Sequence, residues 1–536
     1  MPPVRPRDPL SAPPPADLSV GAFSDHPPWI VQPDDLPWRV GLDLVREHTR
    51  DGVPRLVRRR RLPPWKRIVR VSAILGWALA GWYGVERRKK GSVSRAGLSR
   101  RLRFAFQKLG PTYIKLGQIL SSGEGIFPPE LVSEFKLLRD RVPAESFEVV
   151  RECVEADLGR PLEEVFSEFS TEPVAAASIA QVHRARLFSG EDVVVKVQRP
   201  KVAALVRNDL AVMSFLAPHL VGRIPVTVLA NPPALIELFA ETIVEELDFR
   251  LEAESMLDIA AAIAAAEQRT IVVPRPHPWL VTPRVLVMER LDGFAWDDVG
   301  GMREAGIATE RVMRAAVVSF LEGVMLFGVF HGDLHGGNLF VLPDGRVALL
   351  DFGITGRLDE QHRLAFLRLV MGATMNDVHS QVAALRDLGA LAPDADLDEV
   401  ITELGLTGPP QDVTEMSAEE LTRQMRELTK RLLSYGAKLP KELMLFVKNI
   451  LFLDGVIATF APDVDLLGEV VEVAGYFANR YGDRIAREVG LDPTRAGVDL
   501  DAVRAAIGVS AATERISYRE LQARREAVRR KLRRDP

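Results

Sequence analysis

Apolar residues recur every three to four positions along most of the chain, which predicts a largely helical protein. The pattern runs through residues 92–147, where the break at Gly110 and Pro111 separates two expected helices, and it returns in residues 201–266. A strongly apolar helix is expected over 310–330, and the chain from there to about 470 is predicted to be almost entirely helical. The apolar positions of the first helix are Leu98, Leu102, Ala105, Phe106 and Leu109.

Short alternating runs interrupt the helical pattern from about residue 173. "VHRARLF", a Ser-Gly turn and "DVVVKVQRP" together predict a β-hairpin, and "RVLVMERLDG" at 284–293 predicts a further strand. "RVALLDFG" supplies another strand that ends at Asp351. A small β-rich lobe followed by a helical lobe predicts an α+β, protein-kinase-like bilobal fold.

The Pro-rich beginning of the chain and the later changes of pattern give expected boundaries. We expect a disordered N-terminus at 1–56, a basic-flanked apolar segment at 57–91, a helical extension at 92–150, an N-lobe with a helical insert at 151–290, a C-lobe at 291–470 and a helical C-terminal region with a basic tail at 471–536.

The segment 57–91 has an apolar core from Val71 to Val85 between runs of Arg and Lys. These fifteen residues are fewer than the roughly 20 that a perpendicular membrane-spanning helix needs. Its three Trp residues and one Tyr, together with the basic flanks, favour a helix lying at an anionic membrane surface. An ordinary buried helix with charged ends is the alternative.

The basic helix expected from Arg515 has a thin apolar stripe at Leu521, Val528 and Leu532. This composition fits either a solvated face or a contact with lipid or a partner.

The amino-acid composition restricts the class of protein, its partners and its expected location. Hydrophobic residues make up 47% of the chain and charged residues 26%, as in folded proteins, and the net charge of −4 argues against a nucleic-acid partner. The single cysteine, Cys153, excludes an internal disulfide and a cysteine-based zinc site. The prolines of residues 1–40 leave no apolar stretch for a secretory signal, so we expect a cytoplasmic protein, peripheral at the inner face of the cell membrane if the apolar segment contacts lipid.

A joint spacing of polar residues predicts phosphoryl transfer from ATP. Asp333 and Asn338 stand five apart in "HGDLHGGN", and Asp351 follows thirteen residues later at the start of Asp-Phe-Gly. Carboxylate and amide oxygens are suitable ligands for Mg²⁺ bound to nucleotide, so Asn338 and Asp351 are the expected metal ligands and Asp333 the catalytic carboxylate. Lys196, in the strand "VVVKV", is the expected cation for the phosphates, with a surface ion pair as the alternative.

The nucleotide loop departs from that of protein kinases. No Gly-rich loop precedes the hairpin, and its place is taken by Ala175, Ala176, Ala177 and Ser178, which we expect to contact ATP in a different pose. We also assign Glu289, in the strand-like run 284–293, to the nucleotide site.

The catalytic loop departs as well. Gly332 stands where such kinases carry Arg, His335 where they carry Lys, and no Ala-Pro-Glu follows Asp351, so a ledge for a peptide substrate is not expected. Of the two loop histidines, we expect one to hold the loop and the other to lie near phosphate.

These motifs resemble the UbiB-like atypical kinases, the ABC1 family linked to isoprenoid quinone biosynthesis, over roughly residues 95–465. The resemblance rests on "KLGQ" at 115–118, "AAAS" at 175–178, "ELD" at 246–248, and the HGDLHGGN and DFG pair; "LPKELMLFVKNILFLDGV" at 439–456 is also similar. Leu334 and Gly336 replace two prolines usual in the family's catalytic loop, and the stretch after KLGQ has glycines where Arg and Asp are usual.

The resemblance implies that the extension bearing Lys115, Gly117 and Gln118 folds over the active site. It implies that Glu246 pairs with Lys196 and that Asp248 belongs to the same cluster. It also implies Mg-dependent ATP hydrolysis in lipid or quinone metabolism, with an anionic membrane surface, an isoprenoid lipid or quinone-biosynthesis proteins as partners. A homodimer is compatible with the sequence.

Two other functions stay open at this point. Small-molecule phosphotransferases of the aminoglycoside or choline kinase type also carry His-Gly-Asp-Leu-His, but have no extension like that of Lys115. A nucleotide-gated scaffold or lipid-binding pseudokinase would need the same ligands as an enzyme.

Overall fold

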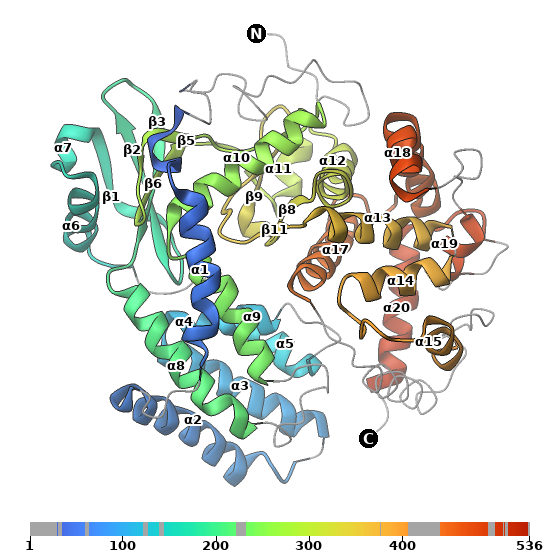
Figure 1. Ribbon diagram of the computed structural model, residues 1–536, viewed down its shortest axis with the longest axis horizontal. Helices are drawn as coiled ribbons and strands as arrows, with labels where there is room; N and C mark the ends of the chain where they lie inside the picture. Colours follow the sequence, from blue (N-terminus) through green and yellow to red (C-terminus); the bar gives the residue numbers. More distant parts are fainter. Residues whose placement is uncertain are drawn as a thin grey trace.

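The computed structural model describes residues 29, 35–58, 64–89, 91–121, 127–138, 144–220, 232–375, 377–405, 440–490, 499–506, 509 and 513–533. Its two lobes and the extension are shown in Figure 1, with the β-rich lobe at the left and the C-terminal helices at the right. This arrangement confirms the α+β, kinase-like fold predicted from the sequence.

A five-stranded antiparallel sheet in the order β1-β2-β3-β6-β5 forms the β-rich lobe. The predicted hairpin is confirmed as β2 and β3, in which Lys196 is paired with Val182, and β6 lies on the other side of β3. Alternate residues of β3 are fully buried valines that pack against α6, since strand side chains alternate between the two faces. The strands are β1 Phe166–Ala176, β2 Ala180–Leu187, β3 Asp192–Gln198, β5 Pro276–Val281 and β6 Val285–Glu289.

Helices surround this sheet and extend below it in Figure 1. The extension and the insert of the N-lobe share one apolar core, so helices that precede β1 pack with helices that lie between β3 and β5 in the chain. The helices are α1 Leu42–Leu56, α2 Trp65–Val85, α3 Gly91–Leu109, α4 Pro111–Ser121, α5 Pro129–Phe135, α6 Phe147–Leu158, α7 Leu162–Val165, α8 Val202–Leu220, α9 Pro232–Glu245 and α10 Phe249–Ala265, with 3₁₀ turns η2 Pro37–Arg39 and η3 Lys136–Leu138.

The C-lobe contains the second sheet, in the order β4-β10-β9-β7, and the short pair β8 and β11. The apolar helix expected over 310–330 is α12, which continues as a π-helical turn and then as β8, so the chain reaches His331 as a strand. The strands are β4 Ile271–Val272, β7 Phe294–Ala295, β8 Val329–His331, β9 Leu339–Val341, β10 Val347–Leu349 and β11 Thr355–Arg357. The helices are α11 Val299–Glu304, α12 Thr309–Glu322, η4 Gly323–Phe327, η5 Gly336–Asn338, α13 Glu360–Thr374, α14 Val378–Asp387, α15 Leu397–Glu403, α17 Lys441–Phe460, α18 Leu466–Val489, α19 Leu500–Ala506 and α20 Tyr518–Arg533. The basic tail is α20, and Leu521 of its apolar stripe is buried; the side chains of Val528 and Leu532 lie outside the described residues.

The prediction of disorder throughout 1–56 is wrong for residues 37–56. Trp38 and Leu42 are buried in the main core beside α10, and α1 continues to Leu56. On α1, Arg46 forms an ion pair with the buried Glu254 of α10. The buried side chains of Trp38 and Leu42 and this ion pair hold residues 37–56 against α10. Neither contact produces a periodic pattern in the local sequence, so the sequence does not predict it. Residues 1–28 lie outside the described residues.

The pair between Arg46 and Glu254 makes a measurable prediction. Arg46→Ala is expected to lower the free energy of unfolding by about 2 kcal/mol, because it leaves a buried carboxylate without its main partner. Arg50→Ala is the matched control on the same helix: its side chain is 59% exposed and 3.7 Å from Glu245, so the loss should stay below about 1 kcal/mol. Urea unfolding of the two variants compares them, and equal losses would contradict this role of Arg46.

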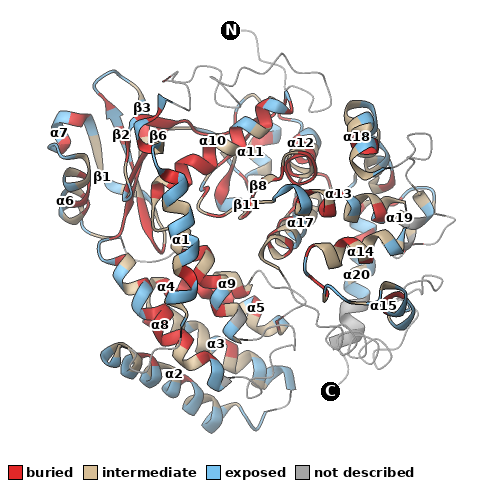
Figure 2. Cartoon of the chain, viewed as in Figure 1, coloured by how far each residue is buried: buried red, intermediate tan, exposed pale blue. Residues whose placement is uncertain are grey.

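The apolar segment of 57–91 forms α2, which is largely exposed, as Figure 2 shows along its outer face. Trp65, Trp77 and Tyr83 are exposed, whereas Val71 and Ala78 face the protein. At 21 residues the helix is longer than the fifteen-residue apolar core. By length and composition α2 and α17 are the two helices of the described chain that could cross a membrane, which by itself is weak evidence.

Candidate active site

A cavity of about 1220 Å³ lies where the β-rich lobe, the catalytic loop and the extension meet. Its volume exceeds the roughly 300–1,000 Å³ of most small-molecule sites. The expected residues of the catalytic loop and of β3 line it, and so do Lys115 and Gln118 of α4. The sequence expectation that the extension folds over the site is therefore confirmed.

Lys196 projects from β3 into this cavity and is buried. Its Nζ donates to Glu252 Oε1 at 2.7 Å and to Asp351 Oδ1 at 3.0 Å. Burial opposes the charged ammonium, but Asp351 and Glu252 outweigh this effect and raise the pKa of Lys196 above its usual value. The predicted pairing of Lys196 with Glu246 is wrong, because Glu252 of α10 takes that place.

Glu246 pairs instead with Lys115 of the extension, at 2.7 Å between Oε1 and Nζ. Glu246 lies in the turn between α9 and α10, whereas Glu252 lies inside α10, so the two carboxylates face different lysines. Burial raises the pKa of Glu246. The carboxylate of Asp248 pairs elsewhere: it caps α10 at the Arg250 amide and pairs with the Arg250 side chain.

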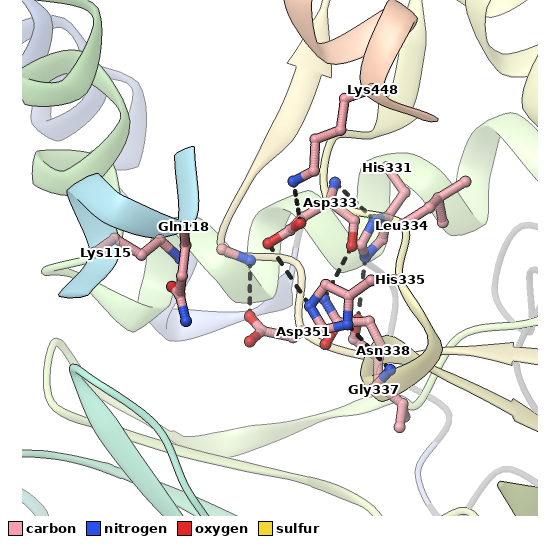
Figure 3. A network of polar contacts seen from close by, with 12 residues as sticks. Lys115, Gln118, His331, Asp333, Leu334, His335, Gly337, Asn338, Asp351 and Lys448 are labelled. Atoms are coloured by element: carbon pink, nitrogen blue, oxygen red, sulfur yellow. Dashed lines mark hydrogen bonds and ion pairs between the residues drawn. The ribbon is translucent and has the colours of Figure 1, made fainter. Parts of the chain in front are cut away.

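The remaining signature residues of the extension fix the position of α4. A Cβ at Gly117 would lie 2.3 Å from Leu138 and 3.3 Å from Phe106, so glycine allows α4 to pack closely on its neighbours. Lys115 and Gln118, about one helical turn apart on α4, stand on the same side of the site, facing the catalytic loop (Figure 3).

Side chains of the catalytic loop hold Asp333 in place through hydrogen bonds to the Asp333 backbone. The Asp333 amide donates to His331 Nδ1 at 3.1 Å, and Asn338 Nδ2 donates to the Asp333 carbonyl at 3.0 Å. His331 is buried and its other ring nitrogen contacts the Leu350 carbonyl at 3.1 Å, so this histidine is a neutral structural residue, as expected for one of the pair. Burial lowers the pKa of His331, which favours the neutral ring. His335, the other histidine, is half-exposed and lines the cavity.

The carboxylates of Asp333 and Asp351 stay ionised in this site. Burial would raise the pKa of each, but nearby lysines prevail and hold both pKa values well below the usual range: Lys448 and Lys115 beside Asp333, and Lys196 and Lys115 beside Asp351. Asp351 has a φ of 56°, which is uncommon for any residue except glycine and turns its carboxylate away from β10 toward the cavity.

The Ala-rich run forms the end of β1 and the turn into β2, directly above the cavity. Ala175 and Ala176 are paired with β2, and Arg199 Nε donates to the Ala177 carbonyl at 3.0 Å, which fixes the turn together with the buried Ser178. The run therefore occupies the place expected for a nucleotide loop. Glu289 also lines the cavity, where its carboxylate accepts a hydrogen bond from the Arg275 amide at 3.3 Å.

The residues present fit a magnesium ion that arrives with nucleotide. Asn338, Asp351 and Asp333 line one cavity and offer carboxylate and amide oxygens, the ligands that Mg²⁺ prefers. Among the described residues no group of three or more His, Cys, Asp or Glu side chains could hold a metal ion alone. Phosphate oxygens and water would complete the coordination, as is usual for Mg²⁺.

Two residues of α17 complete the catalytic loop, and the sequence did not single them out. Lys448 forms an ion pair with Asp333, and the fully buried Asn449 spans the loop, accepting from the Leu334 amide at 3.0 Å and donating to the His331 carbonyl. The available signals were the family-like segment 439–456, which contains both residues, and their position between apolar neighbours. Nothing local connects them with a loop over a hundred residues earlier.

Asn449 should be important for stability. Asn449→Ala is expected to lower the free energy of unfolding by about 2–4 kcal/mol, because it leaves the Leu334 amide and the His331 carbonyl without these partners. Thr459→Ala, at an exposed position of the same helix, should cost less than about 0.5 kcal/mol. Denaturant titration measures both, and similar values for the two variants would refute the bridging role.

Comparison with known proteins adds family information to this geometry. Residues 137–385 match the family model described as "ABC1 atypical kinase-like domain". The curated relatives include "Uncharacterized protein Rv0647c" of Mycobacterium tuberculosis, 36% identical over 70% of this chain and 77% of its own length, and "Probable protein kinase UbiB" of Aliivibrio fischeri, 29% identical over 69% and 68%. A solved complex of Rv3197 with erythromycin, from Mycobacterium tuberculosis, aligns with 65% of this chain and 91% of its own at 23% identity and a TM-score of 0.37.

Proposed function

The chain belongs to the ABC1 atypical kinase-like family, and we propose that it binds Mg-ATP in the cavity described above and hydrolyses it at a membrane surface, in support of isoprenoid quinone or lipid metabolism. The observation that carries the proposal is the gathering of Asp333, Asn338, Asp351 and Lys196 on one cavity, beneath the Ala-rich turn.

The charges of the cavity suit a nucleotide. Lys196 and Lys115 lie beside Asp351 and would meet the phosphates, while Asp333 would orient the oxygen that attacks the γ-phosphorus. Bound Mg²⁺ would neutralise phosphate charge and hold the oxygens in line. The wall that Glu289 and the Ala-rich turn form would enclose the base and sugar.

The acceptor is expected to be water or a small molecule. Lys115, Gln118, Phe135 and Lys136 line the cavity from the extension, so this part of the chain stands where an extended peptide would have to enter. An extension in this position distinguishes the chain from ordinary protein kinases. A small-molecule phosphotransferase remains the second candidate function.

The exposed side of α2 supports a peripheral membrane position. Its exposed aromatic residues lie between basic segments, a composition that favours the headgroup region of an anionic bilayer. The helix is also held to the protein: Arg67 Nη2 donates to the Leu109 carbonyl at 2.6 Å and pairs with the fully buried Asp209. A helix anchored on one side is expected to lie on the surface rather than to cross it, at the inner face of the cell membrane.

The link to quinone or lipid metabolism comes from family membership and from the relative named UbiB. An isoprenoid lipid, or proteins of quinone biosynthesis, are the partners that this proposal includes.

Phosphate release from Mg-ATP, measured with and without anionic liposomes, tests the proposal. We expect hydrolysis that increases with liposomes, and this increase should be lost in Trp77→Ser, which removes an exposed aromatic side chain from α2. Phe188→Ser, an exposed aromatic position away from α2, is the matched control. Tight nucleotide binding without any phosphate release would favour a scaffold, and release that requires an added small-molecule acceptor would favour a phosphotransferase.

A further inference from the structure

The catalytic loop contains no cation of its own. Residues 331–345 include neither Lys nor Arg, although a phosphoryl group transferred beside Asp333 would carry negative charge. Gly332 has no room for a side chain, because a Cβ there would lie 2.8 Å from Ile354 Cγ2 and 3.0 Å from the Ile354 carbonyl oxygen. The cation that neutralises this part of the site has to come from another element.

Lys448 of α17 supplies that charge. Its Nζ forms an ion pair with Asp333 Oδ1, and the side chain lines the same cavity as Lys196 and Asp351. In Figure 3 it reaches Asp333 from a different side than Lys115. Asn449, the next residue, ties α17 to the loop through the His331 carbonyl and the Leu334 amide, so Lys448 is held in register with Asp333.

Three of the lysines that line the cavity, Lys115, Lys196 and Lys448, pair with different carboxylates. Lys196 is bound to Glu252 and Asp351, and Lys115 to Glu246. Lys448 contacts Asp333, the carboxylate expected at the attacking oxygen. Of these three lysines, Lys448 is the one paired with the carboxylate beside which the new bond to phosphorus would form.

We propose that Lys448 is a catalytic residue that binds the transferred phosphoryl group and stabilises its charge in the transition state. This inference rests on the proposed ATP hydrolysis. An ammonium group has three donors, so Lys448 can keep Asp333 in place and also donate to a phosphoryl oxygen. Lys448 lies outside the residues 137–385 that the family model matches.

The bond changes balance without a further reactant. The water oxygen forms a bond to the γ-phosphorus while the bond from this phosphorus to the β,γ-bridging oxygen breaks, and that electron pair remains on ADP. One water proton passes to Asp333 and from there to the released phosphate. Lys448 acts through its positive charge and exchanges no proton in this step; its effect is largest when the phosphoryl group is between the two oxygens.

The test compares Lys448→Met and Lys448→Arg in the full-length chain. For Mg-ATP hydrolysis we expect the methionine variant to lose about 100-fold in kcat with KM within about threefold, and the arginine variant to recover at least a tenth of wild-type kcat. Affinity for Mg-ADP with aluminium fluoride, a mimic of the transferred group, should fall about 100-fold in Lys448→Met, while affinity for Mg-ADP alone should stay within about threefold. Lys441→Met is the control on the same helix, where the lysine contacts Glu245 outside the cavity.

Each outcome decides the inference. Wild-type hydrolysis that Lys448→Met leaves within threefold, or equal losses of affinity for the two ADP complexes, overturns the role of Lys448 alone. A wild type that neither binds nor hydrolyses Mg-ATP overturns the proposed function and this inference with it. If Lys448→Met does not fold, Lys448→Gln, which still donates a hydrogen bond to Asp333, must show the same losses.

Discussion

Replacing Asp351 by asparagine is expected to lower ATP turnover by about 1000-fold while the protein stays folded. The carboxylate contacts Lys196 at 3.0 Å and is one of the two expected ligands of Mg²⁺, so the variant loses a metal ligand and the charge partner of the phosphate-binding lysine together. Asparagine has the same shape and tolerates the φ of 56°, so the backbone at this position should not change. Steady-state phosphate release at saturating ATP measures the effect.

Asp344→Asn is the matched control for this prediction. Asp344 lies in the turn between β9 and β10 and pairs with Arg346, and it does not line the cavity. Its replacement should leave turnover within about twofold of wild type. If Asp351→Asn keeps more than a tenth of wild-type turnover, this carboxylate does not serve the metal, and the proposed site is wrong.

Lys115→Met is expected to lower the free energy of unfolding by about 3–5 kcal/mol. Glu246 is its partner at 2.7 Å and both side chains are largely buried, so removal of the ammonium leaves a carboxylate without charge compensation. Part of that loss should be recovered in Lys115→Met combined with Glu246→Gln, because the glutamine needs no counter-charge. Guanidinium titration of the two variants and of the wild type gives the values.

The control for Lys115 is Lys108→Met, at an exposed position at the end of α3. A change within about 0.5 kcal/mol is expected there. If the double variant is no more stable than Lys115→Met, Glu246 is not the group that Lys115 neutralises. The same variants also test the corrected pairing, since Glu246→Gln should couple energetically to Lys115 much more strongly than to Lys196.

The residues of the catalytic loop were predictable because their relation is local. Asp333, Asn338 and Asp351 lie on the catalytic loop and at the end of the β9–β10 hairpin that follows it, and the spacing between them is enough to place them together. The hairpin that carries Lys196 was predictable for the same reason, because alternation and a Ser-Gly turn are local signals.

Which carboxylate pairs with Lys115 and which with Lys196 could not be predicted from local sequence. The apolar periodicity of residues 201–266 predicts continuous helix past Glu245, but α9 ends at Glu245 and α10 begins at Phe249. Asp248, a residue type that favours helix N-termini, was the available sign of this break. Because of this break, the side chains of Glu246 and Glu252 point in different directions. Glu246 therefore pairs with Lys115, and Glu252 pairs with Lys196.

Contacts between distant segments account for the other differences. Trp38 and Leu42 are buried against α10, and Lys448 and Asn449 meet a loop more than a hundred residues before them in the chain. Such contacts depend on how complete helices pack, and a single sequence contains no periodic pattern that reports them.

Calorimetric titration of the full-length protein with ATP, with and without Mg²⁺, tests the central claim most directly. The account predicts one nucleotide site per chain that binds in the presence of Mg²⁺, with affinity at least about tenfold weaker without the ion or in Asp351→Asn. Absence of binding, or binding that neither Mg²⁺ nor Asp351 influences, would contradict the assignment of this cavity as a Mg-nucleotide site.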